Sequence, residues 1–211
     1  MNTPLARFLS VVFHPLLIPT LLFGLLLIGV PGAVGADTFS LRVRLNLLVL
    51  IALGTFLLPA LLITLLHRAG YVRSLHMEEL TDRRVPYFLT AVLYTTLTLL
   101  FTFRLEQLAT IAPGIGIILA SVTVSVTLVG LISIFWKISA HSVSMSGMIG
   151  ALLGITIQQG EDRLFFPLLV LVALTGMVGT ARLYLNAHTP AQVWAGYGLG
   201  LAVGLACTLG L

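Results

Sequence analysis

The sequence predicts an all-α integral membrane protein, a bundle of about seven transmembrane helices. Of its 211 residues, 58% are hydrophobic and only 9% are charged, whereas a soluble domain usually carries about 25% charged residues. Apolar stretches recur along the chain, and their length is close to the roughly 20 residues that a helix needs to cross the hydrocarbon core of a bilayer. Because backbone groups in lipid must pair within their own segment, these stretches are expected to be helices rather than open strands.

Seven apolar segments follow one another along the chain. The first segment follows a short N-terminal stretch, and its apolar run contains no convincing small-residue cleavage site. We therefore expect an uncleaved membrane segment rather than a signal peptide. The fifth is short and rich in Gly and Ser, and we expect it to be tilted or sheltered inside the bundle. With no soluble insertion or repeat, residues 1–211 are predicted to form a single membrane-embedded domain. The segments are approximately residues 8–30, 45–66, 86–103, 112–135, 144–159, 165–185 and 190–211.

Three polar links follow the second, fourth and sixth segments, at residues 67–85, 137–142 and 182–192. Two crossings separate each link from the next, so all three are expected on the same side of the membrane as the N-terminus. Seven cations lie on that side and four on the other, but only three against four remain when four candidate site cations are set aside. The positive-inside rule therefore leaves both leaflets open. We expect an integral protein of a bacterial inner membrane.

The three links contain the residue types that bind and hydrolyse a phosphate. Cations and imidazoles at membrane edges are costly and indicate functional sites. Arginine binds phosphate oxygens bidentately, and hydrolysis without a metal needs a nucleophile or base and an acid for the leaving oxygen. The candidates for the site are Arg83 and Arg84 in the first link, Lys137, Ser139 and His141 in the second, and Arg182, His188 and Gln192 in the third.

The spacing of the third link resembles a known motif. Arg182-x5-His188-x3-Gln192 is similar to the third motif of the type-2 phosphatidic-acid phosphatase superfamily, which also includes vanadium haloperoxidase-like proteins and usually reads S-R-x5-H-x3-D. The stretch from Ile138 to His141, Ile-Ser-Ala-His, is similar to its second motif, P-S-G-H. The order of the motifs and their same-side placement also match that superfamily.

The first motif of the superfamily, K-x6-R-P, is degenerate in this chain. Arg83 and Arg84 precede Pro86, but counting back from either arginine finds His76 or Met77 where the lysine would stand. The only lysine, Lys137, is therefore a candidate to replace that charge. The resemblance spans roughly residues 68–204, which we take as the phosphatase core.

The resemblance implies a chemical role for each candidate residue. His188 would attack phosphorus and form a phosphohistidine, and His141 would protonate the leaving oxygen. Cations and a hydroxyl would hold the phosphate, and no metal or organic cofactor is implied. The implied substrate is a lipid phosphomonoester or diphosphate, such as a phosphatidic acid-like lipid or a polyprenyl phosphate. The phosphate-binding residues would be Arg182, Ser139, Lys137, Arg83 and Arg84.

Gln192 departs from the aspartate that most members carry. An amide oxygen can accept a hydrogen bond from the imidazole but brings no charge, so His188 should be less basic and its phosphohistidine harder to form. The His188-x3-Gln192 pattern resembles the dolichyl-diphosphatase and glucose-6-phosphatase branches, where glutamine also occupies this place. In the second motif, Ile138 and Ala140 replace proline and glycine, which changes backbone freedom rather than chemistry.

Other readings of the same residues stay open. A lipid-phosphate-binding protein of this fold that is catalytically weak or inactive is the main alternative, motivated by Gln192 and the degenerate first motif. A phosphotransferase is a variant of the main interpretation, and a transporter is disfavoured because its polar positions would lie at the midplane.

Single residues also have simpler explanations. Ser139 could cap a helix, and His14 is expected to have a packing role. We expect lipid partners and no nucleic acid, since the excess of basic residues includes no basic tail.

Replacing the only lysine tests its predicted phosphate contact. Lys137→Met should weaken inorganic phosphate binding about tenfold or more, because a hydrogen bond to a charged group contributes about 1.5–3 kcal/mol. Isothermal titration of the detergent-purified protein with phosphate measures this change. An unchanged affinity and unchanged activity would remove Lys137 from the site.

Overall fold

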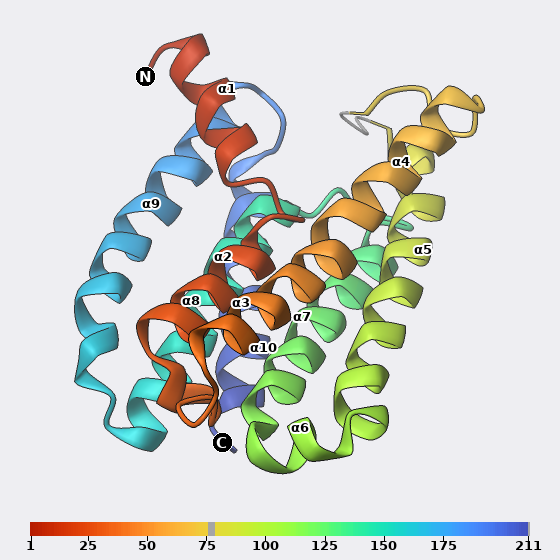
Figure 1. Cartoon of the computed structure of the whole chain (residues 1–211). Coiled ribbons are helices and arrows are strands. Elements are labelled where there is room, and N and C mark those ends of the chain that lie inside the picture. The colour runs from red at the N-terminus through yellow and green to blue at the C-terminus, as the bar shows by residue number, and fades with distance from the viewer. Residues whose placement is uncertain (76–78, 211) are drawn as a thin grey trace.

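The computed structural model describes residues 1–75 and 79–210, and the regular elements in these ranges are all helices (Figure 1). His76, Met77 and Glu78, which belong to the first polar link, lie outside the described residues. Five helices in the described ranges are long and apolar enough to cross a membrane. The prediction of an all-α membrane bundle is therefore confirmed.

The long helices begin and end close to the expected segments. Two of them contain π-helical turns, at Leu53–Leu57 and Leu100–Arg104, which continue the helices without a break. A sixth long helix, α10 (Pro190–Thr208), completes the bundle. The five membrane-spanning helices are Leu41–Arg68 (α3, Leu41–Ala52, and α4, Leu58–Arg68), Leu80–Arg104 (α5, Leu80–Leu99), α7 (Pro113–Ile132), α8 (Ala140–Gln159) and Asp162–Tyr184 (α9, Phe165–Tyr184).

The first apolar segment differs from the expectation of one continuous helix over residues 8–30. It forms α1 (Thr3–Val12) and α2 (Ile18–Gly24), and a π-helical turn extends α2 to Gly29. Pro15 has no N–H to continue a helical hydrogen-bond ladder, and it disfavours helical geometry at the preceding His14. The break is closed locally, because the backbone N–H of Leu16 donates to Nδ1 of His14 at 3.3 Å.

The three polar links meet at one end of the bundle. Figure 1 shows the links that follow α4, α7 and α9 at the same end as the N-terminus, with the C-terminus at the opposite end. Two short helices, the 3₁₀ turn Pro31–Val34 and α6 (Glu106–Ile111), belong to links between the long helices. The crossing order predicted from hydropathy therefore brings the three clusters to one place.

Helices α8 and α10 pack in close contact because glycine lines α10 at every fourth position. A Cβ added at Gly196 would lie 2.7 Å from Cβ of Ser142 and 2.9 Å from the carbonyl oxygen of Ser139. Small residues let helix backbones approach in this way in membranes. Two hydrogen bonds cross the interface: Ser146 Oγ donates to the Gly196 carbonyl, and the Ser139 N–H donates to the Gln192 carbonyl, both at 3.3 Å.

Helix α1 packs against the end of α9 that carries Arg182. Ala6 and Leu9 form a small buried cluster with Ala181, the residue next to Arg182 in the chain. Figure 1 shows α1 (red) beside the upper end of α9 (blue). This contact brings the N-terminal residues to the end of the bundle where the polar links converge.

Crowding the glycine interface should destabilise the bundle. Gly196→Ala places a methyl group against the α8 backbone, and overpacking of this kind typically costs about 1–3 kcal/mol. Gly198→Ala is the matched control, because a Cβ at Gly198 meets nothing within 4 Å. Thermal unfolding in detergent should show a lower midpoint for Gly196→Ala only. Equal midpoints for the two variants would contradict the close contact of α8 and α10.

Candidate functional site

His188 lies in the link between α9 and α10 and is only 9% exposed. Its Nδ1 is 3.2 Å from the backbone carbonyl of Lys137 and 3.2 Å from Oε1 of Gln192. Both neighbours are hydrogen-bond acceptors, so Nδ1 carries the proton. The lone pair of the neutral imidazole is therefore on Nε2, the nitrogen that these contacts leave unused.

Gln192 is fixed by a capping box at the start of α10. The Thr189 N–H donates to Oε1 of Gln192 at 3.1 Å, and the Gln192 N–H donates to Oγ1 of Thr189 at 3.4 Å. The capping box needs an acceptor at this position, which settles which end of the amide faces His188. One oxygen atom thus caps α10 and orients the imidazole.

Two arginines from different helices line the same cavity. Arg182 comes from the last turn of α9, and its Nη1 donates to Oγ of Ser10 at 3.2 Å. Its Nε is buried and has no hydrogen-bond partner among the residues that the structure describes. Arg83, from the first turns of α5, is 5% exposed and donates from Nη1 to the Ile138 carbonyl at 3.2 Å. A buried guanidinium with an unmet N–H is suited to an anionic ligand.

His141 occupies the first turn of α8. Its ring is oriented through Nε2, whereas the ring of His188 is oriented through Nδ1. Its Nε2 lies 3.0 Å from the backbone carbonyl of Ser10, so Nε2 carries a proton and donates. The ring also makes an edge contact with His14, with centroids 5.8 Å apart and planes at 78°. The carbonyl orients this imidazole as the amide oxygen of Gln192 orients the other.

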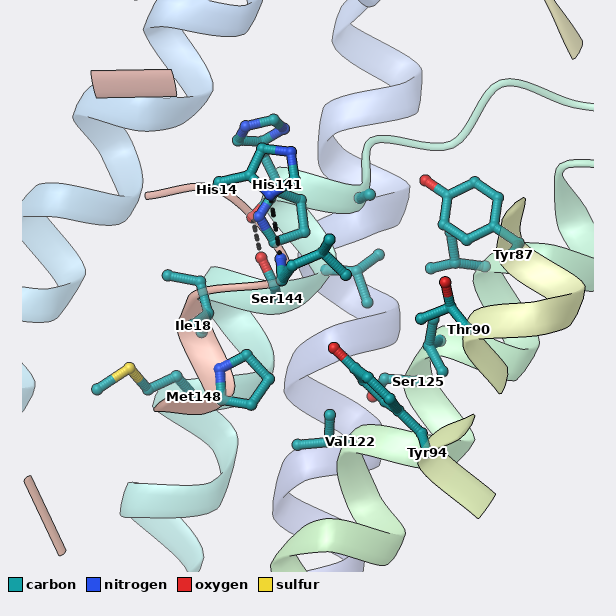
Figure 2. Close-up of a pocket in the computed structure, with 18 of the residues that line it drawn as sticks. His14, Ile18, Tyr87, Thr90, Tyr94, Val122, Ser125, His141, Ser144 and Met148 are labelled. Atoms are coloured by element: carbon teal, nitrogen blue, oxygen red, sulfur yellow. Dashed lines mark hydrogen bonds between the residues drawn. The ribbon is translucent and has the colours of Figure 1, made fainter. Parts of the chain in front are cut away.

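These side chains share a cavity of about 170 Å³ that continues into the bundle. Its polar part contains His14, Arg83, His141, Arg182 and His188. Figure 2 shows His14 and His141 together, with Thr90, Tyr94, Val122 and Met148 farther along the cavity. The volume is several times the roughly 30 Å³ that one water molecule occupies in the liquid. The cavity therefore has one polar end and a mainly apolar body. Side chains of α2, α4, α5, α7 and α8, and of the links that follow α1 and α4, line this body.

The other predicted site residues lie around this group rather than in it. Ser139 is fully buried and caps α8, accepting from the Ser142 N–H at 3.3 Å. Lys137 lines a second hollow that it shares with His188 and Gln192. Arg84 is exposed and donates to the Ile134 carbonyl at 3.3 Å. The structure thus brings Arg83, His141, Arg182 and His188 together, and the chemical roles assigned to all eight residues stay predictions.

Two residues that the sequence analysis did not assign to the site touch its members. Ser10 contacts both Arg182 and His141, and His14 lines the cavity. The available signal was an imidazole followed by proline inside an apolar run. Among the described residues, no group of three or more His, Cys, Asp or Glu side chains could hold a metal ion.

The surroundings of His188 favour its neutral form. Burial, followed by the positive charges of Arg182 and Arg83, lowers the pKa of His188 from its ordinary value of 6.5 to about 4. The hydrogen bonds to Gln192 and the Lys137 carbonyl act in the opposite direction and are weaker. A neutral imidazole at neutral pH is the form that can act as a nucleophile.

Changing the amide to a carboxylate should raise the pKa of His188. Gln192→Glu keeps the acceptor of the capping box and adds a negative charge beside Nδ1, which stabilises the imidazolium. Histidine NMR titration should show the His188 ring protonating near pH 4 in the wild type and at higher pH in the variant. A wild-type value near 6.5, or no shift in Gln192→Glu, would contradict this geometry.

The same depressed pKa has a consequence for stability. Between pH 6.5 and 4 the unfolded chain binds a proton at His188 that the folded protein does not. This group therefore lowers the free energy of unfolding as the pH falls from 6.5 to 4, and has no effect above that window.

The comparisons with known proteins concern the second half of the chain. A family model described as the PAP2 superfamily matches residues 130–210. This range contains His141, Arg182 and His188 but neither Arg83 nor the N-terminal residues. No curated protein and no solved structure matches the chain. The match supports the PAP2 superfamily for residues 130–210 and, with it, phosphatase-type activity in general.

Proposed function

We propose that this protein hydrolyses a lipid phosphomonoester or diphosphate without a metal ion, through a phosphohistidine at His188. The observation that carries the proposal is the fixed tautomer of His188, whose Nδ1 faces two acceptors and leaves the lone pair on Nε2. Arg83 and Arg182 line the same cavity and supply two positive charges for the phosphate. The superfamily match supports an enzyme of phosphatase type.

The first step transfers the phosphoryl group to the enzyme. Nε2 of His188 attacks phosphorus and forms a P–N bond while the P–O bond to the lipid breaks. The leaving oxygen takes a proton from Nδ1 of His141, while the Nε2–H of that ring stays bonded to the Ser10 carbonyl. Arg83 and Arg182 meet the charge on the phosphoryl oxygens, which is the main catalytic requirement of this chemistry.

The second step returns the enzyme to its starting state. Neutral His141 accepts a proton from water while the water oxygen attacks phosphorus. The P–N bond breaks, its electron pair returns to Nε2 of His188, and inorganic phosphate leaves. His188 must begin neutral and His141 protonated, so the rate of hydrolysis is expected to be bell-shaped in pH.

The position of the site favours a lipid substrate. The catalytic candidates lie at the ends of membrane-spanning helices, and the cavity continues from them between apolar side chains of the bundle. A headgroup arriving laterally from the bilayer would place its phosphate at the arginines and the start of its chain in the apolar part. The resemblance of the His188-x3-Gln192 pattern to the dolichyl-diphosphatase branch supports a diphosphate as one of the substrate classes.

Binding of a lipid phosphate without turnover is the second candidate. It is favoured by the neutral partner of His188, because Gln192 cannot stabilise the imidazolium as a carboxylate would. It is also favoured by the depressed pKa of His188, since a weakly basic nitrogen is a weaker nucleophile. The two functions share one site and differ in whether a P–N bond forms.

Phosphate release distinguishes the two functions. Detergent-purified protein should release phosphate from at least one class in a panel of lipid mono- and diphosphates with chelator present. His188→Ala should abolish the release, because it removes the attacking nitrogen, while His67→Ala removes an imidazole outside the cavity and should retain it. Lipid phosphate binding without release by folded wild-type protein would favour the second candidate.

A further inference from the structure

The break between α1 and α2 carries a histidine, His14, that lies outside the three polar links. We propose that His14 is a third histidine of the site and donates its Nε2–H to the phosphate of the lipid substrate. The inference rests on the proposed function for the identity of the substrate, but the phosphate contact can be measured without turnover.

The tautomer of His14 is set by its own turn. The Leu16 N–H donates to Nδ1 of His14 at 3.3 Å, so Nδ1 is an acceptor and has no proton in the neutral ring. The proton is then on Nε2, which makes that nitrogen a donor. Nε2 of His14 is thus a donor, whereas Nε2 of neutral His188 carries a lone pair.

His14 occupies the polar end of the cavity. It lines the same cavity as Arg83, Arg182 and His188, and its ring makes an edge contact with His141 at 5.8 Å. Figure 2 shows His14 and His141 close together at this end. Because His14 lines the cavity, a headgroup that enters the cavity can reach its ring.

Ser10 holds the His14 segment against the site. Its hydroxyl donates to the Ala6 carbonyl at 2.9 Å and accepts from Nη1 of Arg182 at 3.2 Å. Its carbonyl accepts from Nε2 of His141 at 3.0 Å. The chain four residues before His14 is therefore bonded to two candidate site residues, from α9 and α8, and this restricts where the imidazole can lie.

A neutral donor suits this position electrostatically. Arg83 and Arg182 already supply two positive charges to the cavity, and a third cation would be repelled by them in a low-dielectric site. A neutral N–H adds a hydrogen bond to the phosphate without that repulsion, as preorganised donors do around a developing charge. The phosphate has enough oxygen lone pairs for both guanidiniums and the imidazole.

The test measures binding of inorganic phosphate to the full-length protein. His14→Asn keeps an acceptor for the Leu16 N–H, since an asparagine side chain accepts from the residue two positions on. Its amide ends at the level of Nδ1 and has no atom at the position of Nε2, so the donor proposed to bind the phosphate is lost. Loss of one hydrogen bond to a charged group, about 1.5–3 kcal/mol, should weaken phosphate binding roughly ten- to hundredfold. His67→Asn is the matched control, because His67 bonds the Val72 carbonyl outside the cavity and should leave phosphate affinity unchanged.

Binding of a neutral long-chain alcohol separates a donor role from a structural one. His14→Asn should bind the alcohol as the wild type does, because the alcohol occupies the apolar part of the cavity and lacks the phosphate. Phosphate affinity equal to that of the wild type would overturn the proposal. So would a parallel loss of alcohol binding or a lowered unfolding midpoint, because the defect would then be in the turn.

The failure of the proposed function has a different signature. Wild-type protein that binds phosphate but releases none from any lipid would refute the hydrolysis, while the His14→Asn comparison would still be read from binding. Wild-type protein that binds no phosphate would overturn both.

Discussion

The close contact between α8 and α10 is the constraint on which the rest of the site depends. Without side chains at Gly196, Gly200 and Gly204, the two backbones approach until the Ser139 N–H reaches the Gln192 carbonyl. This joins the first turns of both helices, one carrying His141 and the other preceded by His188. The Lys137 carbonyl then lies close enough to accept from Nδ1 of His188. A methyl group between these helices would separate the two imidazoles and remove the contact that fixes one of them.

Two orienting contacts of opposite kind follow from this arrangement. His188 is held through Nδ1 by the second-link backbone and the α10 cap, whereas His141 is held through Nε2 by the Ser10 carbonyl. Each ring is left with a different nitrogen for chemistry. Fixed tautomers of this kind allow one imidazole to attack and another to carry a proton, provided that the surrounding shell holds them rigidly.

Hydropathy was sufficient to predict the helical bundle, because lipid imposes a length and a backbone rule on every crossing. Counting crossings placed the three links together, and the Arg182-x5-His188 spacing located two of the cavity residues. The break at His14 was not predicted, since proline is tolerated inside many membrane helices. Which of Arg83 and Arg84 enters the cavity depends on the rotation of α5. The contacts of Ser10 join it to His141, 131 positions later in the chain, and to Arg182, 172 positions later. No local pattern encodes such distances.

The anchoring of α1 on α9 also sets the order in which the molecule can be completed during synthesis. Helix α1 leaves the ribosome before α9, and its partners Ala181 and Arg182 follow more than 160 residues later. Until α9 has entered the bilayer, Arg182 is absent and the Ser10 hydroxyl has no guanidinium to accept from. The candidate site is therefore complete only once α9 and α10 are inserted, and a chain interrupted before α10 lacks the contact between the first turns of α8 and α10.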